Sequence, residues 1–395
     1  MERTPVLLVS ANYFPKIGGP ATSVPEIARC LSKHGYPVHV LTNQFPGFAA
    51  VEHSEGFTVW RSPSSYRIPN KASVVEHGLS VIEMAKFIRS FVRTHPFRFI
   101  HCHDLNISLL GAWLAGTGLP IIAKYTGDLS IEQQFADVDS VERFERRFNP
   151  LRPSWPTRFF KLGQRGLSEM ATLITANSKY QLDQLHGLGV SPKKSVLLYN
   201  GVSTRSFNVP SGVTITPYRI LFFGRLVAWK GIHVLIQAFN RIAGQFPTAE
   251  LLIVGNGPME RELKAISEKT PHGKRIIFQK AVAPHTVPIQ IAGAQVVVLP
   301  AFYDPFPHSV LETLALVRPM VATRVGGIPE IIEDGKTGWL VEPGDASALA
   351  KAIVDVFQNP AEAERRAVEG ARRVRDRFTW EILVNELEQL YTRFD

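Results

Sequence analysis

The chain has 395 residues, of which 45% are hydrophobic and 20% are charged, a balance typical of folded proteins and not of disordered chains. This length exceeds one ordinary hydrophobic core and predicts two domains. The sequence contains no apolar run of the roughly 20 residues that a membrane-spanning helix needs, and its net charge of +9 favours anionic partners.

The first residues lead directly into the apolar run from Val6 to Val9, which predicts a buried strand and is too short for the apolar part of a signal peptide. We therefore expect a protein that stays in the cytosol. Cys30 and Cys102 lack metal-binding or redox spacing, and we interpret them as reduced, buried thiols.

The N-terminal half alternates short apolar strands with helices, which predicts a doubly wound parallel sheet. The expected strands are Val6 to Val9, Val38 to Thr42, Phe57 to Trp60, Phe99 to His103, Pro120 to Tyr125, Ala171 to Asn177 and Ser195 to Tyr199. Gly18 and Gly19 precede the first helix, where they could let a phosphate or sugar approach the backbone. A Gly-Gly pair in this position is more often only a tight turn.

Polar side chains follow two of these strands. His103 and Asp104 form either a catalytic pair or a hydrogen-bonded histidine beside a helix-capping aspartate. Asp128 has a slightly better functional case, because it ends a strand after Gly127. A zinc site at His101 and His103 is disfavoured, because no further ligand follows at suitable spacing.

The segment from Arg143 to Arg165 interleaves basic and aromatic residues. Such a mixture can lie on an anionic membrane surface, and it can equally be a solvated helix pair with an ordinary apolar face. Asp137 and Asp139 just before it form an Asp-x-Asp sequence, which we interpret as surface charge and not as a metal site.

Residues 206–217 lack periodicity and are the expected hinge between the domains. Beyond them the strand pattern begins again, with strands expected at Tyr218 to Phe223, Leu251 to Val254, Ile276 to Gln279, Val296 to Pro300 and Met320 to Ala322. The second half therefore predicts another doubly wound sheet.

Glycine-bounded loops follow two strands of the second half, one of them ending at Gly255. The other, from Gly224 to Gly231, carries Arg225 and Lys230, which can clamp a diphosphate from two sides. A solvated basic turn is the alternative interpretation.

The stretch from Val296 to Ile332 repeats strand, loop and helix twice and adds the carboxylate pair Asp304 and Glu312, with Glu330 on the second helix. Gly326 and Gly327 open its second helix. Both helices are expected to begin with unpaired amides at the carboxyl edge of the sheet, where an anion binds.

The order of Gly224 to Gly231, Asp304 to Glu312, Gly326 to Glu330 and Gly335 to Val341 resembles the retaining glycosyltransferases of family 4. The resemblance implies the GT-B fold, an α/β architecture in which two doubly wound, Rossmann-like parallel-sheet domains face a central cleft. It implies an acceptor domain at 1–205, a donor domain at 206–375 and a helix at 376–395 that crosses back to the first domain.

The same resemblance implies roles for individual residues. Arg225 and Lys230 match the residues that bind the donor's diphosphate, Glu312 matches the acid that binds ribose, and Asp304 takes the place of the acid near the transferred sugar. The donor is expected to contact backbone at Phe306, His308 and Ser309 and at the glycines Gly18, Gly19, Gly224, Gly255, Gly326 and Gly327. No metal or cofactor is implied.

Three positions depart from the family pattern. Asp304 replaces a glutamate, and Val317 replaces a small glycine. Thr126 stands where the family has a histidine that contacts the sugar, so that Asp128 or His103 would have to supply polar contacts.

The predicted activity is transfer of a sugar from a nucleotide-diphosphate sugar, UDP- ahead of GDP-, to a glycan or lipid-linked acceptor. It would occur in the cytosol or at the inner face of a membrane, with no nucleic-acid partner. Two alternatives stay open: a nucleotide-sugar epimerase of the same fold, and a scaffold that binds the nucleotide sugar without turnover.

Overall fold

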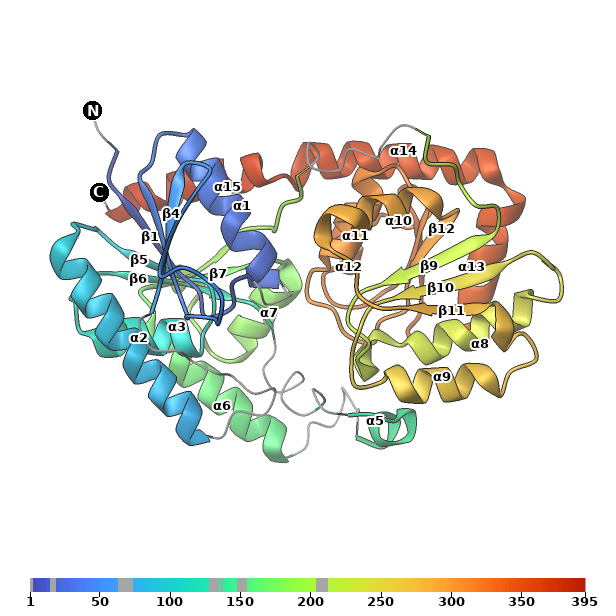
Figure 1. The fold of residues 1–395 in the computed structure, drawn as a ribbon, viewed down its shortest axis with the longest axis horizontal. Helices are drawn as coiled ribbons and strands as arrows, with labels where there is room; N and C mark the ends of the chain where they lie inside the picture. Colours follow the sequence, from blue (N-terminus) through green and yellow to red (C-terminus); the bar gives the residue numbers. More distant parts are fainter. Residues whose placement is uncertain are drawn as a thin grey trace. The chain divides into compact units, whose positions relative to one another are not determined.

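The computed structural model describes residues 3–14, 19–62, 74–127, 135, 138–147, 155–203 and 212–394. They form two compact units (Figure 1). Unit 1 comprises Met1–Asp128, Phe159–Gly201 and Trp380–Asp395, and unit 2 comprises Leu129–Arg158 and Val202–Thr379. The boundaries expected from the sequence, after residues 205 and 375, lie near two of these changeovers, whereas the assignment of 129–158 to unit 2 differs from the expected division.

Unit 1 contains an eight-stranded sheet in the order β3-β4-β2-β1-β5-β6-β7-β8. Its strands are β1 (Val6–Val9), β2 (Val38–Thr42), β3 (Val51–Ser54), β4 (Phe57–Arg61), β5 (Ile100–Cys102), β6 (Ile121–Tyr125), β7 (Leu173–Ala176) and β8 (Ser195–Leu197). All neighbouring strands pair in parallel except β3 and β4, which are antiparallel. Strand β3 was not predicted, because its short, mostly exposed sequence carries no apolar run.

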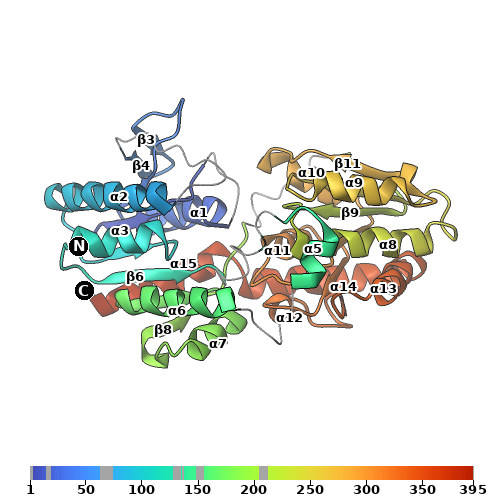
Figure 2. The same cartoon turned by 90° about the horizontal axis from the view of Figure 1, so that it is seen from below.

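Two hydrophobic cores cover the faces of this sheet, because alternate strand residues point to opposite sides. Leu7 and Val9 belong to one core, and Val6 and Leu8 to the other. The helices of unit 1 are α1 (Gly19–Lys33), α2 (Val74–Thr94), α3 (Ile107–Ala115), α7 (Lys179–Gly187), α15 (Trp380–Tyr391) and most of α6 (Trp155–Met170), which enters the unit at Phe159. The first core lies under α2, α3, α6 and α7, which form a row in Figure 2, and α1 and α15 cover the second.

Unit 2 contains a six-stranded, fully parallel sheet in the order β11-β10-β9-β12-β13-β14. Its strands are β9 (Arg219–Phe223), β10 (Glu250–Val254), β11 (Ile276–Gln279), β12 (Val296–Leu299), β13 (Met320–Thr323) and β14 (Trp339–Val341). Its helices are α5 (Val141–Arg147), α8 (Ile232–Ile242), α9 (Glu260–Glu268), α10 (Val287–Gly293), α11 (His308–Ala315), α12 (Ile328–Ile331), α13 (Ala346–Gln358) and α14 (Pro360–Arg377). The prediction of two doubly wound parallel-sheet domains is confirmed.

The chain passes from unit 1 to unit 2 after Gly201 and returns after Thr379. Val202 forms a parallel bridge with Thr379, and its N–H donates to the carbonyl oxygen of Phe378 at 2.9 Å, so both passages lie side by side. The predicted hinge at 206–217 falls mostly outside the described residues.

Cys30 and Cys102 are free and buried, as predicted. Within the described ranges, no helix combines the length and apolarity that crossing a membrane requires.

Candidate active site

The loops after β9 and β10 pack backbone against backbone at the carboxyl edge of the unit 2 sheet. A Cβ atom on Gly255 would lie 1.9 Å from the carbonyl oxygen of Gly224, and one on Gly257 would lie 2.2 Å from that of Leu226. Only glycine permits such an approach. The structure thus gives Gly255 a packing role, and donor contacts at Gly224 and Gly255 stay predictions.

The loop after β9 closes in a short 3-10 turn, η2 (Ala228–Lys230), beside the end of β12. Gly231 follows it with a φ angle of 66°, and a Cβ atom there would lie 2.0 Å from the carbonyl oxygen of Pro300. The N–H of Phe302 donates to the carbonyl oxygen of Trp229 at 2.7 Å. This packing fixes Lys230 next to the residues that follow β12.

Lys230 and Asp304 form an ion pair, in which the lysine Nζ donates to Oδ2 of the aspartate. The exposed fractions of the two side chains are only 19% and 8%. A charge-assisted hydrogen bond of this kind contributes about 1.5–3 kcal/mol. The sequence predicted separate roles for these residues, on the diphosphate and near the sugar, but here each neutralises the other. An anion that binds Lys230 must therefore either share its ammonium group with Asp304 or displace the carboxylate.

Arg225 lies on the same loop with an exposed side chain. Its guanidinium carbon is 5.6 Å from the ring centroid of Trp229, which is itself buried. Stacking on an aromatic face orients a guanidinium while leaving its N–H donors in the plane available. Arg225 can therefore meet an incoming phosphate at the solvent side of the loop.

Glu312 lies on α11, whose apolar residues Val310, Leu311 and Leu314 are buried. The side chain of Glu312 keeps some exposure to solvent. The surrounding protein still removes much of its hydration, and this burial raises its pKa to about 7. Near neutral pH the side chain is thus divided between a neutral carboxyl, which can donate and accept, and a carboxylate, which only accepts. Such a group can form hydrogen bonds with two neighbouring hydroxyls.

The start of α11 contains three residues predicted to meet the donor. Phe306 is buried, and its ring packs on that of Phe378 with centroids 5.7 Å apart, so its side chain serves packing. Pro307 is the N-cap, and His308 begins the helix. The contacts of Phe306, His308 and Ser309 with a donor stay predictions.

The loop after β13 packs closely against the loop that carries Asp304. A Cβ atom on Gly326 would lie 1.9 Å from the carbonyl oxygen of Asp304, and the N–H of Gly327 donates to the same oxygen at 3.2 Å. The following N–H groups of Ile328 and Glu330 are also paired within the turn. The prediction of unpaired amides at this helix start is wrong, because the loop uses them to hold itself and its neighbour. A donor contact at Gly326 or Gly327 stays a prediction.

In unit 1, Asp104 accepts from the N–H groups of Ala11 and Ser108, at 3.1 and 2.9 Å. The helix-capping interpretation of Asp104 agrees with these bonds. His103 is fully buried, neither ring nitrogen has a hydrogen-bond partner, and burial holds its pKa well below the usual range. The expectation of a hydrogen-bonded histidine is therefore wrong.

The end of β6 contains Lys124, whose Nζ donates to Oδ1 of Asn200 at 2.6 Å. Burial lowers the pKa of Lys124 to about 8. Asp128 and Gly18 lie outside the described residues. Gly19 begins α1, and a Cβ atom added there would meet none of the described residues within 4 Å.

A segment made of Phe135 and residues 138–147, called the docked segment below, belongs to unit 2 although the sequence places it with the first half. Phe144 is 1% exposed, so this ring of the basic aromatic region is not available to a membrane. Arg143 pairs with Asp139, as expected of surface charge, and Asp137 is not described. Across the described residues, no cluster of three His, Cys, Asp or Glu side chains could hold a metal.

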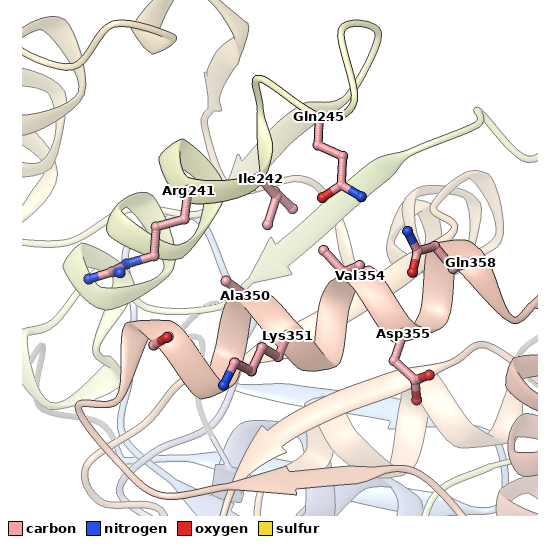
Figure 3. Close-up of a pocket in the computed structure, with 9 residues that line it drawn as sticks. Arg241, Ile242, Gln245, Ala350, Lys351, Val354, Asp355 and Gln358 are labelled. Carbon is pink, nitrogen blue, oxygen red and sulfur yellow. The ribbon is translucent and has the colours of Figure 1, made fainter.

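A groove of about 490 Å³ lies between α8 and α13, at the end of α8 opposite to Lys230. Figure 3 shows its apolar floor of Ile242, Ala350 and Val354. The charged ends of Arg241, Lys351 and Asp355 point in different directions and do not converge on one ligand atom. Convergent polar groups mark a binding site, so this groove is not assigned as one.

Comparison with known proteins shows which protein families the chain resembles. Residues 17–206 match the sequence pattern described as Glycosyltransferase Family 4, and residues 208–374 match that of Glycosyl transferases group 1. The chain is 26% identical to glycogen synthase of Mycobacterium tuberculosis over 412 residues, which cover 98% of this chain and 94% of that protein. It is 23% identical to N-acetyl-alpha-D-glucosaminyl L-malate synthase of Bacillus anthracis over 404 residues, which cover 98% of this chain and 96% of that protein.

Solved structures agree in fold. Sucrose-phosphate synthase from Thermosynechococcus elongatus superposes with a TM-score of 0.82 at 22% identity, covering 99% of both chains. Anabaena HepE in complex with UDP and glucose superposes with a TM-score of 0.76 at 18% identity, covering 99% of this chain and 100% of that one. Fold and relatives together define a glycosyltransferase of the GT-B type. The chain belongs to glycosyltransferase family 4.

Replacing Glu312 by glutamine tests its buried environment. Because the native pKa is raised, ionisation of Glu312 destabilises the folded state progressively as the pH rises from the unfolded pKa through about 7. Glu312→Gln should therefore have a higher free energy of unfolding than wild type at pH 8, by at most about 3 kcal/mol, and so melt at a higher temperature. The two proteins should differ little at pH 5. Calorimetry at both pH values checks this, and an equal effect at both would contradict the assignment.

Proposed function

We propose that the protein transfers a sugar from a nucleotide-diphosphate sugar to a glycan or lipid-linked acceptor with retention of configuration and without a metal. The observation that carries this proposal is the meeting of Lys230 and Asp304 beside the exposed Arg225 at one sheet edge. UDP-sugars are expected ahead of GDP-sugars. The complexes of Anabaena HepE with UDP and with UDP-glucose support a uridine donor, whereas the Arabidopsis starch synthase IV complex contains ADP.

Charge explains the proposed reaction. As the bond between sugar and diphosphate lengthens, the sugar gains oxocarbenium character and the leaving group gains negative charge. Lys230 and Arg225 would stabilise that charge in place, which lowers the barrier only to the extent that they bind the transition state better than the donor. In this scheme Glu312 holds the ribose hydroxyls, and no enzyme side chain acts as a nucleophile.

Asp304 changes partner in this scheme. When a phosphate takes Lys230, the carboxylate loses its ion-pair partner and becomes available to the donor sugar, as proposed for this position. Aspartate is one methylene shorter than the glutamate of the family pattern, so it can reach Lys230 while leaving more space at the sugar.

A donor screen tests the proposed reaction. Incubation with UDP-, GDP- and ADP-sugars should give hydrolysis or transfer with one of them, in the presence of a chelator, and the product should keep the donor's anomeric configuration. Epimerisation at C2 of the sugar, or tight binding without turnover, would instead support one of the two alternatives.

Lys230→Ala and Arg225→Ala should each lower kcat, by about 10²–10³-fold for the more buried Lys230, because each removes a fixed cation from the leaving group. Lys351→Ala is the matched control, since it removes an exposed lysine of the α8–α13 groove. Steady-state kinetics with the selected donor provide the measurement. Unchanged turnover in both active-site variants would refute the diphosphate assignment.

We also propose that this protein is cytoplasmic and binds peripherally to an anionic membrane through a surface of unit 1. Helices α2, α3 and α6 cover one face of its sheet, and they expose large apolar side chains: Leu79, Ile82, Trp113, Leu114 and Leu162. Cations on α2 and α6, Lys86, Arg93 and Arg165, are exposed among them. Apolar insertion combined with attraction to phosphate headgroups is the usual mode of peripheral binding.

Vesicle flotation tests this surface. The protein should float with phosphatidylcholine vesicles that contain phosphatidylglycerol and less with phosphatidylcholine alone, and Leu162→Glu should reduce flotation. Val368→Glu alters a similarly exposed apolar residue of unit 2 and should have no effect. Equal flotation of all proteins, or none, would contradict the proposal.

A further inference from the structure

The docked segment follows β6 of unit 1 in sequence, yet three of its apolar side chains are buried in unit 2. Phe135, Val138 and Phe144 are 4%, 2% and 1% exposed. Figure 1 shows α5 beside unit 2, and α5 contacts the turn η2 that carries Lys230. Unit 2 therefore receives part of its apolar packing from a segment that lies in the first half of the sequence.

Four rings connect this segment with the centre of unit 2. Phe135 packs edge to face on Phe144 with centroids 5.4 Å apart, and Phe144 packs on Phe302 at 5.3 Å. Phe302 in turn stacks on His233 at 5.7 Å with an interplanar angle of 10°. Aromatic pairs at these distances contribute directional packing beyond the area they bury.

Phe302 also belongs to the proposed active site. Its N–H donates to Trp229, the neighbour of Lys230, and its chain leads two residues later to Asp304. The ring of Phe302 is thus held by Phe144 on one side and by His233, at the start of α8, on another. Phe302 thus adjoins both loops that carry the Lys230–Asp304 ion pair.

The contact between Glu145 of the docked segment and His233 is not a hydrogen-bonded ion pair. His233 is buried, its Nε2 has no hydrogen-bond partner, and burial lowers its pKa to about 4, so it is neutral near pH 7. Oε1 of Glu145 lies 3.8 Å from that nitrogen, too far for a hydrogen bond. The segment contacts the residues that follow β12 through the aromatic packing of Phe144 on Phe302.

The geometry points to Phe144 as a positioning residue for the reaction, one that acts through Phe302 to hold the loops of Lys230 and Asp304 in the arrangement that receives the donor's β-phosphate. This inference rests on the proposed function. It gives the region between Phe135 and Arg147 a role in donor binding, in addition to any contact with the acceptor.

The test compares binding of UDP and UMP to wild type and to Phe144→Ala by calorimetry. UMP lacks the β-phosphate, so the ratio of the two affinities reports on the loops around Lys230 and is independent of the fraction of folded protein. Phe144→Ala should weaken UDP binding roughly three- to tenfold and leave UMP binding unchanged. Phe144→Leu, which keeps an apolar side chain, should restore most of the loss. Arg146→Ala is the control on the same helix, because Arg146 is exposed and pairs with Glu142.

Hydrogen exchange of the free protein supplies a readout that needs no nucleotide. Phe144→Ala should speed amide exchange in 228–233 and 300–304, and Arg146→Ala should not. Equal weakening of UDP and UMP, or unchanged UDP binding, would overturn the inference. If wild type binds neither nucleotide, the proposed uridine donor is wrong, and the role of Phe144 is then tested by hydrogen exchange alone. Unchanged exchange rates in both ranges of Phe144→Ala would in that case overturn the role of Phe144 as well.

Discussion

The ion pair between Lys230 and Asp304 joins the two loops on which the proposed chemistry depends. It is recessed from solvent, so its charges interact more strongly than a surface pair would. Backbone packing brings the partners together: Gly231 lies against Pro300, and Gly326 and Gly327 lie against Asp304. A donor diphosphate offers Lys230 two further negative groups, and exchanging one partner for the other would couple donor binding to release of the carboxylate that is proposed to face the sugar.

Most of the fold could be predicted from the sequence, because buried parallel strands leave uninterrupted apolar runs such as Val296 to Leu299. Strand β3 could not, since it is a mostly exposed edge strand that pairs through its backbone. The docked segment was also missed, because its helix pattern shows that it has an apolar side without showing which unit covers that side. Phe135 and Phe144 were the available signal, two aromatic residues in a segment too charged to form a core alone.

The sequence indicated which residues belong to the candidate site, but it indicated only part of how they contact one another. Arg225, Lys230, Asp304 and Glu312 follow strands as the family pattern requires, and the structure brings Lys230 to Asp304. That these two neutralise each other depends on a contact between loops 74 residues apart, which periodicity does not encode. The raised pKa of Glu312 likewise follows from burial in three dimensions. Gly255 and Gly326, which were predicted to approach a ligand, also lie close to neighbouring backbone, a role that the sequence pattern did not indicate.

The most direct test of this account is the affinity of Asp304→Asn for UDP, measured by calorimetry beside wild type. Asparagine keeps the size of the side chain but removes the charge that competes for Lys230. If the ion pair is exchanged when the donor binds, the variant should bind UDP several-fold more tightly, roughly three- to tenfold, while its turnover with the nucleotide sugar falls. Weaker binding of UDP by Asp304→Asn would show that Asp304 positions Lys230 for the diphosphate and does not compete with it, and would contradict the exchange.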